Sequence, residues 1–96
     1  MNFVYIHTHD SGRYIQPYGI AADNPNLMRL ARESFMFHQA HSAAPICSPS
    51  RTALLTGMYP HCSGMYGLSH RGFVTNDFSR HLSNFLHRNG YYTVLA

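Results

Sequence analysis

A proline and a glycine bracket a run of helix-forming side chains within residues 47–57, and this pattern constrains the fold more than any other in the sequence. Pro49 fits the first turn of a helix, where its missing N–H costs no hydrogen bond. Residues 52–55 can continue that helix, and Gly57 suits its C-terminal end. The pattern therefore predicts a helix that begins at or just after Cys47 and ends before Gly57.

Cys47 and Arg51 bring reactive groups to the start of this expected helix. Free backbone N–H groups and the positive end of the helix dipole favour an anion there. Arg51 lies about one turn further on, so its planar guanidinium can reach back toward the same point. A thiol, a helix N-terminus and an arginine together suit a sulfate or phosphate ester. The alternative is a buried cysteine that precedes an ordinary capped helix.

The complete string CSPSRTALLTG at residues 47–57 resembles the signature of type I sulfatases at every defining position. In that family the cysteine is oxidised after synthesis to formylglycine, an aldehyde that acts as the nucleophile once it is hydrated. The resemblance implies that Cys47 and Arg51 are catalytic and that the converted Cys47 also lies against the metal. It further implies a formylglycine-generating maturation enzyme as a partner.

The metal that this resemblance implies is a divalent cation, usually calcium, whose early ligands are two adjacent aspartates after the first strand. In this chain Asp10 matches the second aspartate, and His9 stands in place of the first. Calcium prefers oxygen ligands, whereas imidazole suits manganese or zinc better. We therefore expect Asp10 and His9 as ligands of Ca²⁺, with Mn²⁺ or Zn²⁺ as alternatives. An aspartate before Ser-Gly can also simply cap its own turn.

Two other enzyme classes share single features with this sequence. His7 and His9 lie two residues apart after an expected strand, a pattern that also opens metal-dependent phosphoesterases of the PHP type and amidohydrolases. This pair is a weak signal in a chain with eight histidines. Cysteine-dependent phosphatases need five residues between cysteine and arginine, but only three separate Cys47 from Arg51.

The order of the expected elements predicts an α/β layer with a parallel core. This order resembles the N-terminal part of the alkaline-phosphatase-like α/β/α sandwich with its mostly parallel sheet, so residues 1–96 are expected to form an incomplete N-terminal portion of a sulfatase catalytic domain. Apart from the signature helix, the expected elements are a strand at 3–6, a loop at 14–23, a helix at 25–34, a strand at 35–40, a loop-rich stretch at 58–78, a helix at 79–88 and a strand at 91–96.

Three further residues are candidates for substrate binding. His61 belongs to a Tyr-Pro-His segment of the kind that follows the signature helix in many sulfatases. His70 and Arg71 end the segment 64–71, which resembles the corresponding stretch in the N-sulfoglucosamine sulfohydrolase (heparan N-sulfatase) branch. An arginine there can bind a sulfate or carboxylate through two hydrogen bonds. The alternatives are a loop histidine and a solvated turn.

Composition narrows the possible partners. Charged residues make up only 11% of the chain, which is typical of a segment largely buried inside something bigger. The net charge of +3 is spread along the sequence, so nucleic-acid binding is not expected. No apolar run approaches the length of a membrane span. The N-terminus shows no secretory signal, so the chain as written is expected in the cytoplasm. Two cysteines form no disulfide framework.

Taken with the resemblance, these features predict a sulfuric ester or sulfamate hydrolase that acts on a sulfated small molecule or glycan. In the family, the general acid and the remaining metal ligands come from later segments, so residues 1–96 alone are expected to be inactive. A phosphonate or phosphodiester hydrolase of the same superfamily is the alternative enzyme. A non-catalytic remnant is the alternative of a different class.

Overall fold

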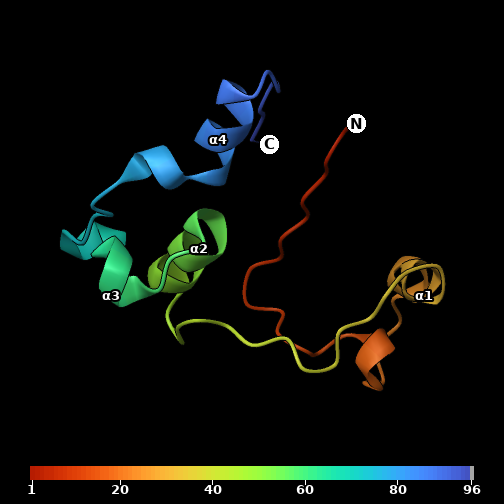
Figure 1. The fold of residues 1–96 in the computed structure, drawn as a ribbon. Helices are drawn as coiled ribbons and strands as arrows, with labels where there is room; N and C mark the ends of the chain where they lie inside the picture. The colour runs from red at the N-terminus through yellow and green to blue at the C-terminus, as the bar shows by residue number, and fades with distance from the viewer. Residues whose placement is uncertain (96) are drawn as a thin grey trace. The chain divides into compact units, whose positions relative to one another are not determined.

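The computed structural model describes residues 1–95 and consists of short helices joined by loops (Figure 1). The elements, in chain order and with η marking 3-10 helices, are η1 (Gln16–Tyr18), α1 (Pro25–Arg32), α2 (Cys47–Thr56), α3 (Pro60–Ser63), η2 (Ser69–Arg71), η3 (Phe78–Arg80) and α4 (Leu82–Arg88). The chain divides into two units, Met1–Ala40 and His41–Ala96. A helix long and apolar enough to cross a membrane does not occur in the described part of the chain.

Strands are predicted at 3–6, 35–40 and 91–96, but the structure contains no strand within residues 1–95. Ala96, the last residue of the third predicted strand, lies outside the described residues. A short apolar segment becomes a strand only when a neighbouring strand pairs with its backbone and another layer covers its side chains. Val4 and Ile6 are 85% and 82% exposed, so no such layer covers the first segment. Of the predicted α/β fold, the described residues therefore show the helices but not the sheet.

In the N-terminal unit, helix α1 starts at the predicted residue, but the Asn24 side chain makes a different hydrogen bond from a helix cap. Pro25 is its first residue and Asn24 is its N-cap. The Asn24 side chain does not cap the helix: its Oδ1 accepts from the Gln16 N–H at 3.2 Å, and the Asn24 N–H donates to Gln16 Oε1 at 3.1 Å. This reciprocal pair joins the start of α1 to η1, an element that falls within the predicted loop 14–23. Helix α1 ends at Arg32, two residues before the predicted end.

In the C-terminal unit, helix α2 confirms the predicted signature helix. Gly57 adopts a left-handed φ of 67° and donates its N–H to the Ala53 carbonyl at 2.9 Å. Glycine populates this region without the steric penalty that a Cβ brings, which explains why the helix stops here. Pro49 is the third residue of α2 and lies in the first turn, as predicted. The first turn tolerates it, since an N–H there has no partner within the helix.

The predicted loop-rich stretch 58–78 contains helices α3 and η2, the first residue of η3 and a buried junction. Ser63, at the end of α3, is fully buried, and Thr75 and Met65 are each 7% exposed. The Ser63 carbonyl accepts from the Asn76 N–H at 2.7 Å and from Thr75 Oγ1 at 3.1 Å. These bonds join the two ends of the segment 64–76, which we call its base. Figure 1 shows α3 next to α2, with this segment continuing from it.

The predicted helix at 79–88 is divided in two. His81 has an extended backbone (φ −63°, ψ 135°), so η3 ends before it and α4 begins after it. Nδ1 of His81 caps α4 by accepting from the Ser83 N–H at 3.3 Å. Asn89 and Gly90 end α4 as predicted, with Gly90 at a φ of 82°. A histidine that can accept a cap bond thus makes two short helices out of one expected helix.

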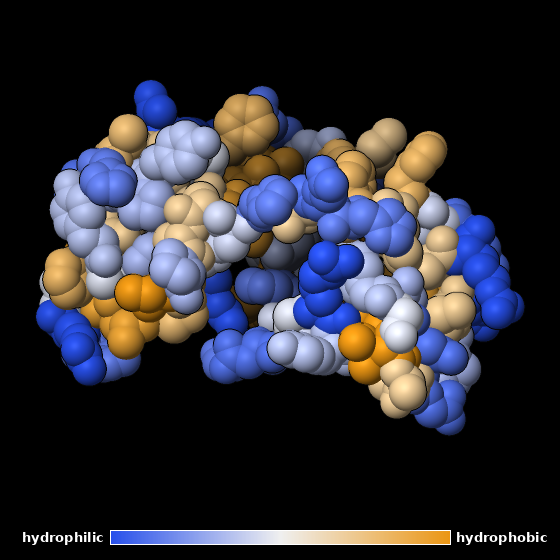
Figure 2. All heavy atoms as spheres, turned by 90° about the horizontal axis from the view of Figure 1, so that it is seen from below, coloured by the Kyte–Doolittle hydropathy of each residue, from blue (hydrophilic) through white to orange (hydrophobic). Residues whose placement is uncertain are grey.

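The core of the described chain is thin. The accessible surface is 8248 Å², whereas two separate compact proteins of the sizes of the two units would expose roughly 6,700 Å². Figure 2 shows apolar residues on the surface among polar ones. Examples with more than half of their surface exposed are Phe3, Tyr5, Leu30, Phe35, Phe37, Leu54, Val74, Phe78 and Phe85. The described residues therefore leave much of their apolar surface uncovered.

Candidate functional site

Cys47 occupies the first position of helix α2, as the sequence predicts. Its side chain is exposed and its thiol is free. Ile46 is the N-cap and contributes no side-chain hydrogen bond to the helix. The N–H groups of Cys47 and Ser48 therefore have no acceptor within the helix, because the first intrahelical bond runs from the Ser50 N–H to the Ile46 carbonyl at 2.9 Å. This end of α2 offers both donors and an accessible reactive side chain.

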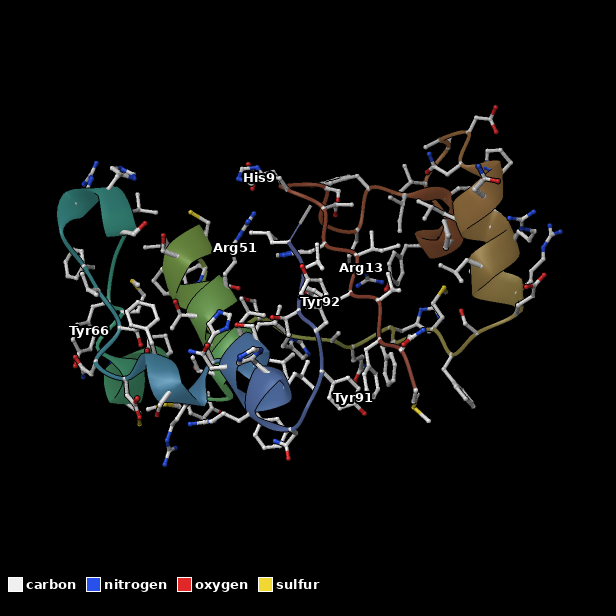
Figure 3. All side chains as sticks on the ribbon, turned by 90° about the horizontal axis from the view of Figure 1, so that it is seen from above. His9, Arg13, Arg51, Tyr66, Tyr91 and Tyr92 are labelled. Carbon is white, nitrogen blue, oxygen red and sulfur yellow. The ribbon has the colours of Figure 1, made fainter. Side chains whose placement is uncertain are left out.

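Arg51 follows Cys47 by one helical turn on α2 and is partly buried. Side chains four residues apart share a face of a helix, so the guanidinium and the Cys47 side chain project from the same side. Figure 3 shows the Arg51 side chain extended away from α2. Within residues 1–95, Arg51 forms no ion pair, so its charge is not neutralised by a carboxylate. The face that carries Cys47 is therefore positively charged and supplies planar donors suited to an oxyanion.

Helix η2 carries His70 and Arg71 and is joined to the same end of α2. The Ser69 N–H donates to Oγ of Ser48 at 3.3 Å, a bond between residues 21 apart in sequence. Both basic side chains are exposed, and neither forms an ion pair among the described residues. The structure thus brings the predicted substrate-binding pair and the predicted catalytic pair into one unit, linked by this hydrogen bond.

His61 is held differently from the other candidates. It lies in helix α3, and its ring packs edge-on against Tyr66 with centroids 5.9 Å apart. The Tyr66 hydroxyl donates to the His61 carbonyl at 3.1 Å. The ring is exposed, so it remains accessible to a ligand, but its contact with Tyr66 also gives it a structural role.

His9 and Asp10 form a pair in the N-terminal unit. His9 Nδ1 lies 3.1 Å from Asp10 Oδ2, and both side chains are largely exposed. Asp10 has a left-handed φ of 54°, and Ser11 bonds to Thr8 beside it. The carboxylate makes no hydrogen bond to the backbone of the described residues. The alternative in which Asp10 caps its own turn is therefore not observed.

This pair fits part of a metal site. A carboxylate next to one imidazole nitrogen fixes the ring so that the other nitrogen can bind a metal, and the carboxylate oxygens can themselves be ligands. Calcium takes about six to eight oxygen ligands, so His9 and Asp10 would supply only a minority. No group of three or more histidine, cysteine, aspartate or glutamate side chains with metal-binding geometry occurs among the described residues. His7 contacts Tyr5 through its ring, with centroids 5.7 Å apart.

Sequence reasoning did not identify Ser48 and Ser69 as parts of this site. Their hydrogen bond joins two segments whose separation along the chain gives no periodic signal. A neighbouring contact outside the candidate site was missed as well: the Ser42 hydroxyl lies 2.7 Å from that of Ser50. The only sequence signal was the high serine content around the cysteine.

Comparison with known proteins gives one family and several named relatives. The family model described as Sulfatase matches residues 1–96. A protein named Ulvan-active sulfatase, from Formosa agariphila, is 33% identical over 103 aligned residues, which cover 95% of this chain and 17% of that protein. Human N-acetylgalactosamine-6-sulfatase is 47% identical over 57 residues, covering 59% of this chain and 10% of that protein.

Human N-sulphoglucosamine sulphohydrolase is 43% identical over 60 residues, which cover 62% of this chain and 12% of that protein. No solved structure matches the chain. The chain spans 17% and 20% of the length of the two Formosa agariphila relatives, which align with nearly all of it.

Proposed function

Because the chain belongs to the sulfatase family, we propose that it supplies the nucleophile and the first anion-binding groups of a sulfuric ester or sulfamate hydrolase. The alkaline-phosphatase-like α/β fold is what this family membership implies for the whole protein. The PHP-type and amidohydrolase hypothesis drawn from His7 and His9 loses its basis, because the matched family is a different one. The observation that carries the proposal is the exposed Cys47 at the first position of α2, one turn before Arg51.

In this proposal Cys47 is the residue that a maturation enzyme converts to formylglycine. One hydroxyl of the hydrated aldehyde would attack sulfur and displace the alcohol or amine of the substrate. The second hydroxyl would then lose its proton, so that the sulfate leaves and the aldehyde is restored. The exposure of Cys47 leaves room for a substrate at this position. The N–H groups of Cys47 and Ser48 point out of the helix end, where the dipole favours the negative charge of the sulfate.

Arg51 neutralises the charge that develops on the sulfuryl oxygens. A guanidinium donates two parallel hydrogen bonds to an oxyanion, and these charge-assisted bonds are stronger than bonds between neutral groups. Arg51 has no carboxylate partner among residues 1–95, so no internal ion pair must be broken before it binds the sulfate. It therefore orients the substrate and stabilises the transition state with a single side chain.

Asp10 and His9 are proposed as ligands of a divalent cation, with calcium as the first choice and manganese or zinc as alternatives because of the imidazole. Bound there, the metal would act as a Lewis acid that polarises a sulfate oxygen. The support is the pairing of His9 Nδ1 with Asp10 Oδ2, which holds both donors close together.

A sulfated sugar is the proposed substrate. Two relatives carry names that specify sulfated amino sugars, N-acetylgalactosamine-6-sulfatase and N-sulphoglucosamine sulphohydrolase. Arg71 and His70 on η2 and His61 on α3 provide exposed donors for a sulfate, carboxylate or hydroxyl of such a sugar. Arg71 and His70 are the better placed, since η2 is bonded to the first turn of α2.

The test is a titration of the ¹⁵N-labelled chain with inorganic sulfate, followed by two-dimensional NMR. We expect the largest shifts at the Cys47 and Ser48 amides and at Arg51 Nε. Arg51→Gln should weaken binding about tenfold, the equivalent of one charge-assisted hydrogen bond. Arg29→Gln, on α1, removes one exposed positive charge elsewhere and is the matched control. If Arg51→Gln and Arg29→Gln lose sulfate affinity equally, the loss is explained by net charge alone and the proposal is contradicted.

Inorganic phosphate, titrated in parallel, tests the alternative of a phosphonate or phosphodiester hydrolase. A clear preference for phosphate at the same amides would favour that alternative. No response to either anion would favour a non-catalytic remnant.

A further inference from the structure

We propose that Ser48 is a positioning residue, which fixes the basic pair His70 and Arg71 beside Cys47 through its hydrogen bond to Ser69. This inference rests on the proposed function, because it concerns how the same site holds its substrate. The backbone N–H of Ser48 belongs to the proposed anion site, whereas its side-chain hydroxyl is bonded to Ser69 and takes no part in the reaction. Its role is to set the distance between two groups of donors.

The turn that carries η2 makes few hydrogen bonds to the rest of its unit. Within Leu68–Gly72, the backbone bonds are local, from Arg71 to Leu68 at 2.9 Å and from Gly72 to Ser69 at 3.0 Å. Among the described residues, the bond from the Ser69 N–H to Ser48 Oγ is the one hydrogen bond that leaves this turn. Loss of the Ser48 hydroxyl would therefore release the turn from helix α2.

The base of the same segment, by contrast, is tightly fixed. The buried Ser63 carbonyl binds Asn76 and Thr75. A Cβ on Gly67 would meet the ring of Phe73 within 2.6 Å, so the two sides of the segment lie in close contact. The base of the segment is therefore fixed, whereas the turn Leu68–Gly72 is bonded to α2 only through Ser69 and Ser48 among the described residues. This one hydrogen bond consequently determines where the turn lies relative to α2.

The position of this bond gives it a functional consequence. Ser48 directly follows Cys47, and Ser69 directly precedes His70. Consecutive Cα atoms lie about 3.8 Å apart, so the basic pair stays within two residues of the link and Cys47 within one. A ligand that reaches from α2 to η2, such as a sulfated sugar, gains from this prearrangement, whereas inorganic sulfate at α2 alone does not.

The experiment compares Ser48→Ala, Ser48→Thr and Ser42→Ala in the 96-residue chain. Ser48→Thr keeps the acceptor oxygen. Ser42→Ala removes another hydroxyl next to the first turn of α2, but one that does not touch η2. Each variant is titrated with inorganic sulfate and with glucosamine 6-sulfate, and hydrogen exchange of the Ser69 amide is recorded.

We expect Ser48→Ala to weaken binding of glucosamine 6-sulfate about fivefold, as expected for the net loss of one hydrogen bond. Because alanine keeps the backbone N–H and removes only the hydroxyl bonded to Ser69, the loss of affinity for inorganic sulfate should be clearly smaller than the loss for glucosamine 6-sulfate, and the Ser69 amide should exchange faster. Ser48→Thr should restore both properties, and Ser42→Ala should resemble the wild type.

The titrations distinguish failure of the proposed role of Ser48 from failure of the proposed function. If wild-type and Ser48→Ala chains bind glucosamine 6-sulfate equally while sulfate still shifts the α2 amides, the role of Ser48 is refuted and the proposed function stands. If neither ligand shifts the α2 amides of the wild type, the proposed function fails, and the role of Ser48 fails with it.

Discussion

The buried carbonyl of Ser63 accepts a hydrogen bond from the Asn76 N–H at 2.7 Å and thereby closes the segment that carries His70 and Arg71. Thr75 Oγ1 donates a second bond to the same oxygen at 3.1 Å. Thr75→Val removes this second bond and conserves the side-chain shape. We expect about 1 kcal/mol less protection against local opening, since the carbonyl keeps its backbone partner. Amide exchange at Asn76 measures this, and the exposed Thr93→Val is the control. Equal exchange in both variants would contradict this role of Thr75.

Two glycines of this segment should respond unequally to alanine. Gly64 and Gly72 have similar left-handed φ values of 80° and 89°. A Cβ on Gly64 would collide with the Asn76 side chain, whereas a Cβ on Gly72 would meet nothing within 4 Å. Each alanine costs about 1–2 kcal/mol of backbone strain, and Gly64→Ala should cost more. Chemical denaturation compares the variants, and Gly64→Ala combined with Asn76→Ala should recover the difference. A larger effect at Gly72 would show that the junction is not closed as described.

His9 should control the preference of the proposed metal site. His9→Asp provides the adjacent pair of aspartates that the family resemblance implies, and it replaces a nitrogen donor with oxygen donors. Calcium affinity should therefore rise and zinc affinity should fall. Isothermal titration calorimetry with each metal measures both effects, and Asp10→Asn should weaken binding of either metal. Unchanged affinities in His9→Asp would mean that position 9 does not contact the metal.

The carboxyl of Asp77 should titrate below its ordinary range. The hydroxyl of Ser79 and then its backbone N–H, at 2.8 Å from Asp77 Oδ1, lower the pKa of this exposed group, and Arg80 acts in the same direction. Because the folded-state pKa is the lower one, the stabilising contribution is present above the ordinary pKa. It is lost as the pH falls through the lowered value. Carboxyl ¹³C titration should show Ser79→Ala raising the pKa of Asp77, and Ser83→Ala leaving it unchanged. A rise of equal size in both would contradict the assignment to Ser79.

The helices could be predicted because their ends are determined by neighbouring residues. Pro25 after Asn24, Gly57 after Thr56, and Gly90 after Asn89 each act within a turn of the helix end that they define. The division at His81 could not be predicted, because histidine is a rare N-cap and its bond to Ser83 depends on the ring orientation. Local chemistry therefore gave most of the helix bounds, but not every interruption.

The sheet and the full site depend on partners distant in sequence. The apolar segment 3–6 has the composition of a strand, but a strand also needs a paired neighbour and a covering layer. In the candidate site, the positions of Cys47 and Arg51 follow from one helix and were predictable. The link from Ser48 to Ser69 depends on how the segment 64–76 folds back, for which the sequence has no periodic pattern.

Conversion of Cys47 to formylglycine is the most direct test of the central claim. The chain is produced together with a formylglycine-generating enzyme, treated with an aminooxy reagent, and analysed by peptide mass spectrometry. Cys62, the second exposed and free cysteine, is an internal control within the same molecule. We expect an aldehyde at residue 47 that reacts with the reagent, and an unmodified thiol at residue 62. Thiols retained at both positions would contradict it.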